Sequence, residues 1–302
     1  MAADLLDALA RRVLISTGAT GSNLASRGMD LGECVVKWEL DHPQEVEDLM
    51  RQFIDSGSEV IEVGSGGANR FRLQPYGLQD HAAEFNFQLA RLWREMTPAD
   101  CFLVGSIGVT SRFLKPAGDV TFEEMYEGYC EQIENLARGG VEGFWMVTMS
   151  DILETGAAIK AAKDCTGLPV IASMVFDSTP KGFYTMMGAD PGTSARELQR
   201  WGADVVGTNC GGTPFRFENI PKIIEEMKAA CDRYVVAKPN AGAPRMMGGQ
   251  MEYQLPPEEM AREALKWISA GARIIGGCCG TTPEHIAKMA ELIHREGISN
   301  PQ

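Results

Sequence analysis

The segment Arg273-Ile274-Ile275-Gly276-Gly277-Cys278-Cys279-Gly280-Thr281-Thr282-Pro283-Glu284-His285 joins a strand pattern to a helix pattern near the end of the chain. The short apolar run at 272–275 predicts a buried strand, and the two glycines after it end that strand. Thr282-Pro283-Glu284 is typical of a helix start, because proline is favoured at the first helical position. The adjacent cysteines therefore lie on the turn between a strand and a helix.

A second cysteine occupies a similar place in the chain. Gly207-Thr208-Asn209-Cys210 follows a strand-like run at 203–206. Adjacent cysteines cannot bridge each other without a strained ring, but on a turn both sulfur atoms can reach one metal ion. A cysteine pair alone is more simply explained as two inert buried thiols. Two glycine-flanked cysteine sites at strand ends instead favour a shared metal site.

The composition limits the class of protein. The chain has 302 residues, of which 44% are hydrophobic and 23% charged, as in ordinary globular proteins. Its net charge of -13 argues against nucleic acid or anionic membranes as partners. The start lacks the basic region of a signal peptide, and no apolar run approaches membrane-spanning length. Eight cysteines are too sparse for a disulfide scaffold, so we expect a cytoplasmic protein.

Strand and helix patterns alternate along the whole chain. Apolar runs occur at 13–16, 60–63, 102–105, 144–147, 169–174, 203–206, 234–237 and 272–275. Amphipathic stretches lie between them, for example at 44–56, 123–138, 152–163, 218–230 and 257–270. Continuous apolar strands that alternate with helices indicate a parallel sheet. Eight such units, with no linker-like segment, predict an α/β fold: one (β/α)8 TIM barrel domain over residues 1–302.

The longest irregular stretches are predicted at 67–79 and 177–192, after the second and fifth strands. Loops in these places belong to the catalytic face of a barrel and shape its pocket. Residues 182–188 carry aromatic and Met side chains that suit simple packing better than a lid or a dimer contact.

Several motifs together resemble the homocysteine S-methyltransferase family, in particular the homocysteine module of cobalamin-dependent methionine synthases as a stand-alone domain. The resemblance covers nearly the whole chain. Its motifs are Gly18-Ala19-Thr20-Gly21, Gly67-Ala68-Asn69-Arg70, Gly105-Ser106-Ile107-Gly108, Thr148-Met149-Ser150-Asp151, Gly207-Thr208-Asn209-Cys210, Pro239-Asn240-Ala241-Gly242 and Gly276-Gly277-Cys278-Cys279-Gly280-Thr281-Thr282-Pro283.

This resemblance implies a zinc-bearing (β/α)8 barrel in which Cys210, Cys278 and Cys279 bind Zn2+ and Asn240 lies close to the metal. It also implies methyl transfer to a zinc-activated thiolate, with homocysteine converted to methionine as the family default. A free thiol has a pKa of about 8.5 and is mostly protonated at neutral pH, whereas a zinc-bound thiol is deprotonated. The zinc ion would therefore activate and place the nucleophile.

The substrate pocket departs from the family pattern. Thr17 and Val147 stand where the family has Asp and Glu, the two carboxylates that meet the homocysteine ammonium group. Small or apolar residues replace polar ones after Glu62, and Lys238 stands where a neutral residue is common. Such a pocket suits a less cationic, an anionic or a bulkier apolar substrate. The substrate-binding set predicted on this basis is Thr17, Glu62, Ser65, Val147, Thr148, Lys238 and Asn240.

Three functions remain open at this point. The first is methyl transfer to homocysteine. The second is methyl transfer involving another small thiol or a methylated compound, together with a separate corrinoid protein, because the chain contains no obvious cobalamin or folate domain. The third is a non-catalytic zinc-binding scaffold, which three cysteines in a glycine-rich mouth argue against, since structural zinc is closed by four protein ligands.

Four other polar residues near the motifs have simpler explanations. Arg70 suits a surface ion pair as well as it suits a site. Asp151 and Glu154 are expected to cap the helix that follows the fourth strand and to pair with its dipole. His285 lies inside a helix start and is expected to be structural.

Overall fold

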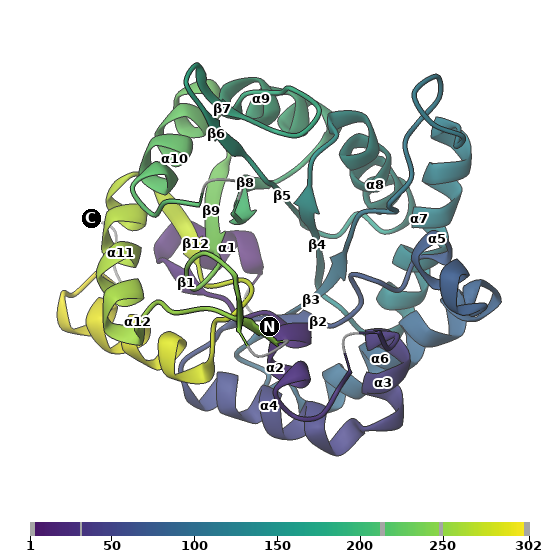
Figure 1. Cartoon of the computed structure of the whole chain (residues 1–302), viewed down its shortest axis with the longest axis horizontal. Helices are drawn as coiled ribbons and strands as arrows, with labels where there is room; N and C mark the ends of the chain where they lie inside the picture. The colour runs from purple at the N-terminus through teal and green to yellow at the C-terminus, as the bar shows by residue number, and fades with distance from the viewer. Residues whose placement is uncertain (1–3, 31, 212–214, 248–249, 299–302) are drawn as a thin grey trace.

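Eight parallel strands form the centre of the molecule (Figure 1). The structure is a computed structural model that describes residues 4–30, 32–211, 215–247 and 250–298. All eight apolar runs predicted from the sequence form strands of this sheet. The strands are β1 (Leu14–Ile15), β2 (Val60–Val63), β3 (Phe102–Ile107), β4 (Gly143–Met149), β5 (Val170–Met174), β8 (Val205–Cys210), β9 (Tyr234–Pro239) and β12 (Ala272–Ile275).

The sheet closes on itself. Its order is β1-β12-β9-β8-β5-β4-β3-β2, with every neighbouring pair parallel. A bridge between Ser16 and Val60 joins β1 to β2, and the Glu59 and Thr17 amides donate to carbonyls across the same seam. The predicted (β/α)8 barrel is therefore confirmed.

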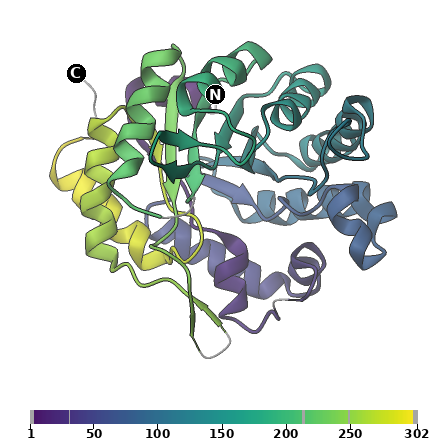
Figure 2. The same cartoon turned by 45° about the horizontal axis from the view of Figure 1, so that its top comes forward.

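Helices surround the barrel on its outside (Figures 1 and 2). One long helix follows each strand of the barrel, so each βα unit returns the chain to the same end of the sheet. These helices are α4 (Pro43–Asp55), α6 (Ala82–Met96), α7 (Phe122–Gly139), α8 (Ile152–Cys165), α9 (Pro191–Trp201), α10 (Asn219–Ala230), α11 (Pro257–Ser269) and α12 (Pro283–Arg295). Among the described helices, none is both long and apolar enough to cross a membrane.

The helix starts carry recognisable caps. Thr121 and Glu124 form a reciprocal capping box at the start of α7. Pro283 begins α12, as the sequence predicts, and Thr282 and His285 cap it in the same reciprocal way. The His285 ring also contacts the Leu255 carbonyl at 2.9 Å, so this histidine has the structural role expected of it.

The inside of the barrel is an apolar layer that is closed at one end. Helix α1 (Leu5–Arg11) packs its Leu5 and Leu9 side chains against this layer, and Arg273 on β12 donates to the Leu9 carbonyl at 3.0 Å. The layer takes residues from all eight strands: Leu14, Val60, Phe102, Val104, Trp145, Ile171, Val205, Val236 and Ile274. With the amino-terminal end filled in this way, the carboxyl-terminal end remains for a site.

Two segments expected to be irregular contain regular structure. The stretch at 67–79 forms α5 (Arg70–Leu73) and a turn of 3-10 helix, η1 (Gln74–Tyr76), and a second turn, η2 (Gln79–His81), follows. The stretch at 177–192 contains an antiparallel hairpin of β6 (Asp177–Thr179) and β7 (Gly182–Tyr184). Four further elements have no counterpart among the predicted strands and helices: α2 (Thr20–Ala25), α3 (Val35–Asp41), and the hairpin of β10 (Arg245–Met247) and β11 (Gln250–Glu252). These elements are too short for a periodic pattern to stand out.

Candidate metal and substrate site

Three cysteine side chains meet at the carboxyl end of the barrel. Cys210 is the last residue of β8, and Cys278 and Cys279 lie on the turn after β12. The Cys210 and Cys278 sulfur atoms are 2.9 Å apart, and all three sulfur atoms lie within 4.8 Å of one another. Tetrahedral zinc with bonds of about 2.3 Å places thiolates about 3.8 Å apart, a spacing inside this range. The donor set therefore fits a zinc ion.

The electrostatics of this cluster also favour a cation. Hydrogen bonds from Cys210 and Cys278 lower the pKa of Cys279, and a further one comes from Tyr253. The same hydrogen bonds raise the pKa of Cys210, because its proton is shared with the other two sulfur atoms. The three thiols thus hold one negative charge readily and resist a second. A divalent cation offsets that repulsion and allows all three to ionise.

Asn209 holds the site together from the middle of the barrel. Its side-chain oxygen accepts hydrogen bonds from the Thr148 amide at 2.8 Å and the Ser173 hydroxyl at 2.7 Å. Its amide nitrogen donates to the Thr148 hydroxyl at 2.8 Å and lies 3.9 Å from the Cys278 sulfur. Asn209 belongs to the quoted cysteine motif but was not predicted as a site residue. The signal that could have revealed it is a polar amide at the end of an otherwise apolar strand pattern.

The backbone is strained at two residues beside the metal site. Thr148 has φ 59° and Cys210 has φ 57°, both in the left-handed region that non-glycine residues rarely adopt. Their side chains approach each other, with the Thr148 hydroxyl 3.5 Å from the Cys210 sulfur. Such a conformation costs on the order of 1–3 kcal/mol and persists only where its surroundings hold it. Here the Asn209 hydrogen bonds hold Thr148 in this conformation, next to Cys210.

The Asn240 side chain supports the backbone of the turn that carries Cys278 and Cys279. Its side-chain oxygen accepts a hydrogen bond from the Cys279 amide at 3.1 Å. The Cys278 amide donates to the Pro239 carbonyl at 2.7 Å, and the Ala241 amide donates to the Cys279 carbonyl at 2.9 Å. Asn240 therefore lies next to the three cysteines, where its side chain positions the Cys279 backbone.

A cavity of about 260 Å³ opens beside the cysteines. We call it the mouth cavity, because it lies at the mouth of the barrel. Its walls come from the carboxyl ends of β2, β3, β4, β8 and β9, from the segments that follow β1, β2 and β12, and from α3. Its lining residues are Gly18, Ala19, Thr20, Gly21, Val35, Glu39, Glu62, Val63, Gly64, Gly66, Gly67, Arg72, Ser106, Val147, Thr148, Asn209, Lys238 and Cys278. The volume suits a small molecule, and Cys278 connects it to the metal site.

The predicted substrate residues divide into two groups. Glu62, Val147, Thr148 and Lys238 line the mouth cavity. The remaining three (Thr17, Ser65 and Asn240) are buried but are not among its lining residues. The Ser65 hydroxyl donates to the Ser106 carbonyl at 2.8 Å, so it ties the loop after β2 to β3. Thr17, Ser65 and Asn240 each lie just after a strand, where the alternation of side chains along the strand no longer predicts which way a side chain points.

A buried ion pair forms the floor of the cavity. Lys238 and Glu62 contact each other with 4% and 7% of their side chains exposed. The Ser106 hydroxyl donates to Glu62 at 3.3 Å, and the Lys238 ammonium lies 5.1 Å from the centre of the Trp145 ring. Burial raises the pKa of Glu62, and Lys238 opposes that rise. Because Glu62 takes up the Lys238 charge, this lysine alone does not make the cavity cationic.

Glu39 on α3 is a carboxyl group of the cavity wall that sequence reasoning missed. Its side chain is fully buried, and the Trp93 indole donates to Oε2 at 3.3 Å. Oε1 has no hydrogen-bond partner among the described residues. Burial raises the pKa of Glu39 to about 8, and the Trp93 hydrogen bond only partly opposes this. No helix was predicted at 35–41, so nothing in the sequence singled out Glu39.

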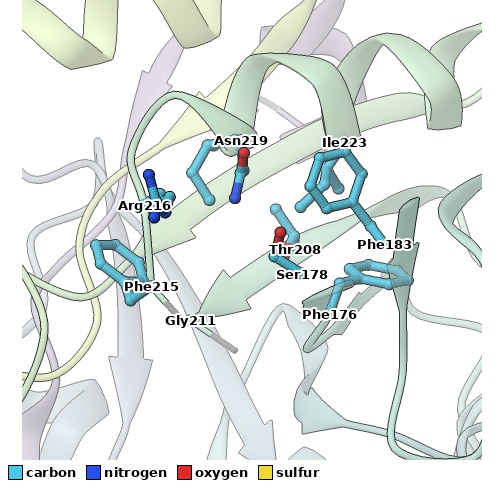
Figure 3. A pocket seen from close by; sticks show the side chains of 10 residues that line it. Phe176, Ser178, Phe183, Thr208, Gly211, Phe215, Arg216, Asn219 and Ile223 are labelled. Carbon is cyan, nitrogen blue, oxygen red and sulfur yellow. The ribbon is translucent and has the colours of Figure 1, made fainter. Parts of the chain in front are cut away.

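A second hollow lies between the β6–β7 hairpin, β8 and α10 (Figure 3). Aromatic rings of Phe176, Phe183 and Phe215 surround it, together with Thr208 and Ile223. Its volume of about 20 Å³ accommodates little more than a water molecule. The mouth cavity is therefore the candidate substrate site.

The polar residues with simpler explanations mostly behave as expected. Arg70 pairs with Glu131 at 2.9 Å, and Asp151 caps α8 by accepting from the Leu153 amide at 2.8 Å. Glu154 lies in the first turn of α8, as expected for pairing with the helix dipole, but the capping role predicted for it is wrong. Its buried carboxylate instead accepts from the Thr110 amide and hydroxyl, both at 2.7 Å, and from the Tyr129 hydroxyl at 3.1 Å.

Comparisons with known proteins agree with this geometry. Residues 14–293 match the sequence model of the family described as Homocysteine S-methyltransferase. The methionine synthases of Mycobacterium leprae and Mycobacterium tuberculosis are each 25% identical, over 97% and 96% of this chain. The chain spans about a quarter of the length of these two relatives, 25% in each case.

Solved structures show the same fold. The homocysteine methyltransferase MmuM from Escherichia coli superposes in its oxidized form with a TM-score of 0.74 at 19% identity, covering 92% of this chain and 95% of MmuM. Its metallated form gives a TM-score of 0.73 at 19% identity, with 92% and 96% covered.

Proposed function

Because the chain belongs to the homocysteine S-methyltransferase family, we propose that it is a zinc-dependent enzyme that transfers a methyl group to a thiolate. Cys210, Cys278 and Cys279 would hold the zinc ion, and homocysteine is the default acceptor, with methionine as the product. The observation that carries this proposal is the group of three cysteine sulfur atoms within 4.8 Å beside the mouth cavity.

Zinc at this site would supply a Lewis acid that keeps the substrate sulfur deprotonated and nucleophilic at neutral pH. The chain's own residues hold the three cysteines in place. Asn240 fixes the Cys279 backbone, and Asn209 fixes Thr148 next to Cys210. The Lys238–Glu62 pair closes the floor of the cavity without adding net charge.

The methyl donor belongs to the same proposal. We propose a corrinoid protein as the donor, because the chain is similar to part of the methionine synthases of two mycobacteria. A cytoplasmic location and a small-molecule substrate, without nucleic acid, likewise stay predictions.

A second candidate is methyl transfer involving a different small thiol, or from a methylated substrate to the corrinoid protein. Val147 favours it, because this apolar side chain lines the cavity at the position where the family has a carboxylate. Thr17 stands at the position of the other family carboxylate. It is buried, and its hydroxyl has no hydrogen-bond partner among the described residues.

The test is an assay of zinc-loaded protein with homocysteine, other thiols and methylated compounds, with and without a methylcorrinoid. Zinc-dependent consumption of a methyl group, lost in Cys279→Ala, supports the proposal. Equal activity in the metal-free protein would refute it.

A further inference from the structure

The mouth cavity contains one carboxyl group that has no charged partner among the described residues. Among its lining residues only Glu39 and Glu62 are acidic, and Glu62 is paired with Lys238. Glu39 has a single hydrogen bond, from Trp93 to Oε2, which leaves Oε1 as an unused acceptor.

The local structure makes room for Glu39 at this wall. The residue opposite is Gly64, just after β2, and a Cβ atom there would overlap the Glu39 carboxyl group. The Glu39 carboxyl group on α3 therefore packs directly against Gly64, in the space that a side chain at 64 would occupy. Any larger residue at 64 would displace the carboxyl group from this wall.

A buried carboxylate without a counterion is costly, and burial therefore keeps this group protonated up to a pKa of about 8. A positively charged group within hydrogen-bond distance of Oε1 would offset that cost and let the carboxyl group ionise. A neutral or anionic group would not. Without a ligand, the Glu39 carboxyl group is therefore neutral at pH 7, and a bound cation would favour its ionised form.

We propose that Glu39 receives a positively charged group of the substrate, either the ammonium group of an amino thiol acceptor or the onium centre of a methyl donor. This inference rests on the proposed methyltransferase function and names its substrate class. Glu39 would take over, from α3, the recognition that the sequence shows to be absent at Thr17 and Val147. The prediction of a less cationic substrate is thereby replaced by a cation held at a different wall.

Arg72 on α5 gives the cavity a second charge. It is exposed, its guanidinium donates to the Ser111 hydroxyl at 2.7 Å, and it forms no salt bridge within the part of the chain that the structure describes. A substrate that carries both a cationic and an anionic group would meet opposite charges at Glu39 and Arg72. An amino-acid thiol has this character.

Titration calorimetry on zinc-loaded protein tests the acceptor arm. The probes are homocysteine and 4-sulfanylbutanoate, which has the same thiol and carboxylate but no ammonium group. Glu39→Gln should weaken homocysteine binding by about 10- to 100-fold, the range for one charge-assisted hydrogen bond, and change 4-sulfanylbutanoate binding less than about twofold. In parallel, homocysteine should release more protons on binding to the wild-type protein than to Glu39→Gln at pH 7.

The second arm uses trimethylsulfonium and tetramethylammonium as probes for a donor cation. Their binding should be lost in Glu39→Gln if the cation belongs to the donor. Glu47→Gln removes an exposed carboxylate and serves as the charge control. Glu39→Met provides a second neutral variant if Glu39→Gln does not fold.

The inference is overturned if neutral variants at position 39 leave all of these affinities unchanged, or weaken both thiols equally. Failure of the proposed function gives a different result. In that case neither thiol binds the zinc-loaded wild-type protein more tightly than the metal-free protein, while the onium probes still report on Glu39.

Discussion

Lys238 and Glu62, which are 176 residues apart in the chain, form an ion pair inside the barrel that is almost fully removed from solvent. Removing one partner of such a pair leaves an uncompensated buried charge, which is usually far more harmful than removing both.

Lys238→Met should therefore lower the free energy of unfolding by about 3–5 kcal/mol, because Glu62 is left alone. The double variant Lys238→Met, Glu62→Gln should recover much of this loss. Urea unfolding measures both. Lys37→Met is the control, since its pair with Asp41 is about half exposed and such pairs contribute about 1 kcal/mol or less. A double variant no more stable than Lys238→Met would contradict this prediction.

One zinc ion should bind per chain through Cys210, Cys278 and Cys279. Cys279→Ala should lose most of the metal, because two thiolates hold zinc far less tightly than three. Metal analysis of purified protein measures the zinc content. Cys34→Ala, a half-buried cysteine outside the three-cysteine group, should keep it. Full retention in all three single variants of the site would rule out this assignment.

The stability of the wild-type protein should depend on Glu39 between about pH 5 and pH 8. Its pKa rises from 4.5 to about 8 on folding, so the protonated carboxyl group is favoured in the folded state. Stability is complete at low pH and falls as the pH approaches 8, by about 1.4 kcal/mol per unit from this one group. Glu39→Gln cannot titrate and should lack this part of the loss. Urea unfolding at several pH values tests the difference, and a constant gap between the two proteins would contradict it.

Homocysteine should bind less tightly here than to a family member that has both carboxylates. Thr17→Asp, Val147→Glu should tighten binding by about tenfold or more, since one charge-assisted hydrogen bond contributes about 1.5–3 kcal/mol. Val147 lines the mouth cavity and Thr17 does not, so Val147→Glu alone should supply most of this gain. Calorimetry decides it, with exposed Leu153→Glu as the control. Tight binding to the wild-type protein with no gain in the variants would refute the argument.

Much of the fold and of the metal site can be predicted from the sequence. The eight strands can be recognised in the sequence because each is a continuous apolar run, buried on both faces. The three cysteines can be brought together because the carboxyl ends of parallel strands share one face of a barrel.

The residues that form the walls of the candidate substrate site cannot be predicted from the sequence in the same way. Glu39 comes from a helix outside the barrel. Only the tertiary structure shows that its carboxyl group occupies the space beside Gly64. The Lys238–Glu62 pair joins opposite parts of the chain, so a lysine that looked like a free charge proves to be neutralised. Ser65 lies in a bend, where the alternation of a strand no longer gives the direction of the side chain.

The shared space of Glu39 and Gly64 has a consequence for how this site diverged. A carboxyl side chain at 39 and any side chain at 64 exclude each other, so neither position can change freely while the other is kept. Across relatives we expect the two positions to covary: glutamate at 39 should occur with glycine at 64, and a shorter residue at 39 should occur where 64 carries a side chain. Intermediates with both side chains would be selected against, so the two substitutions should appear together in a lineage.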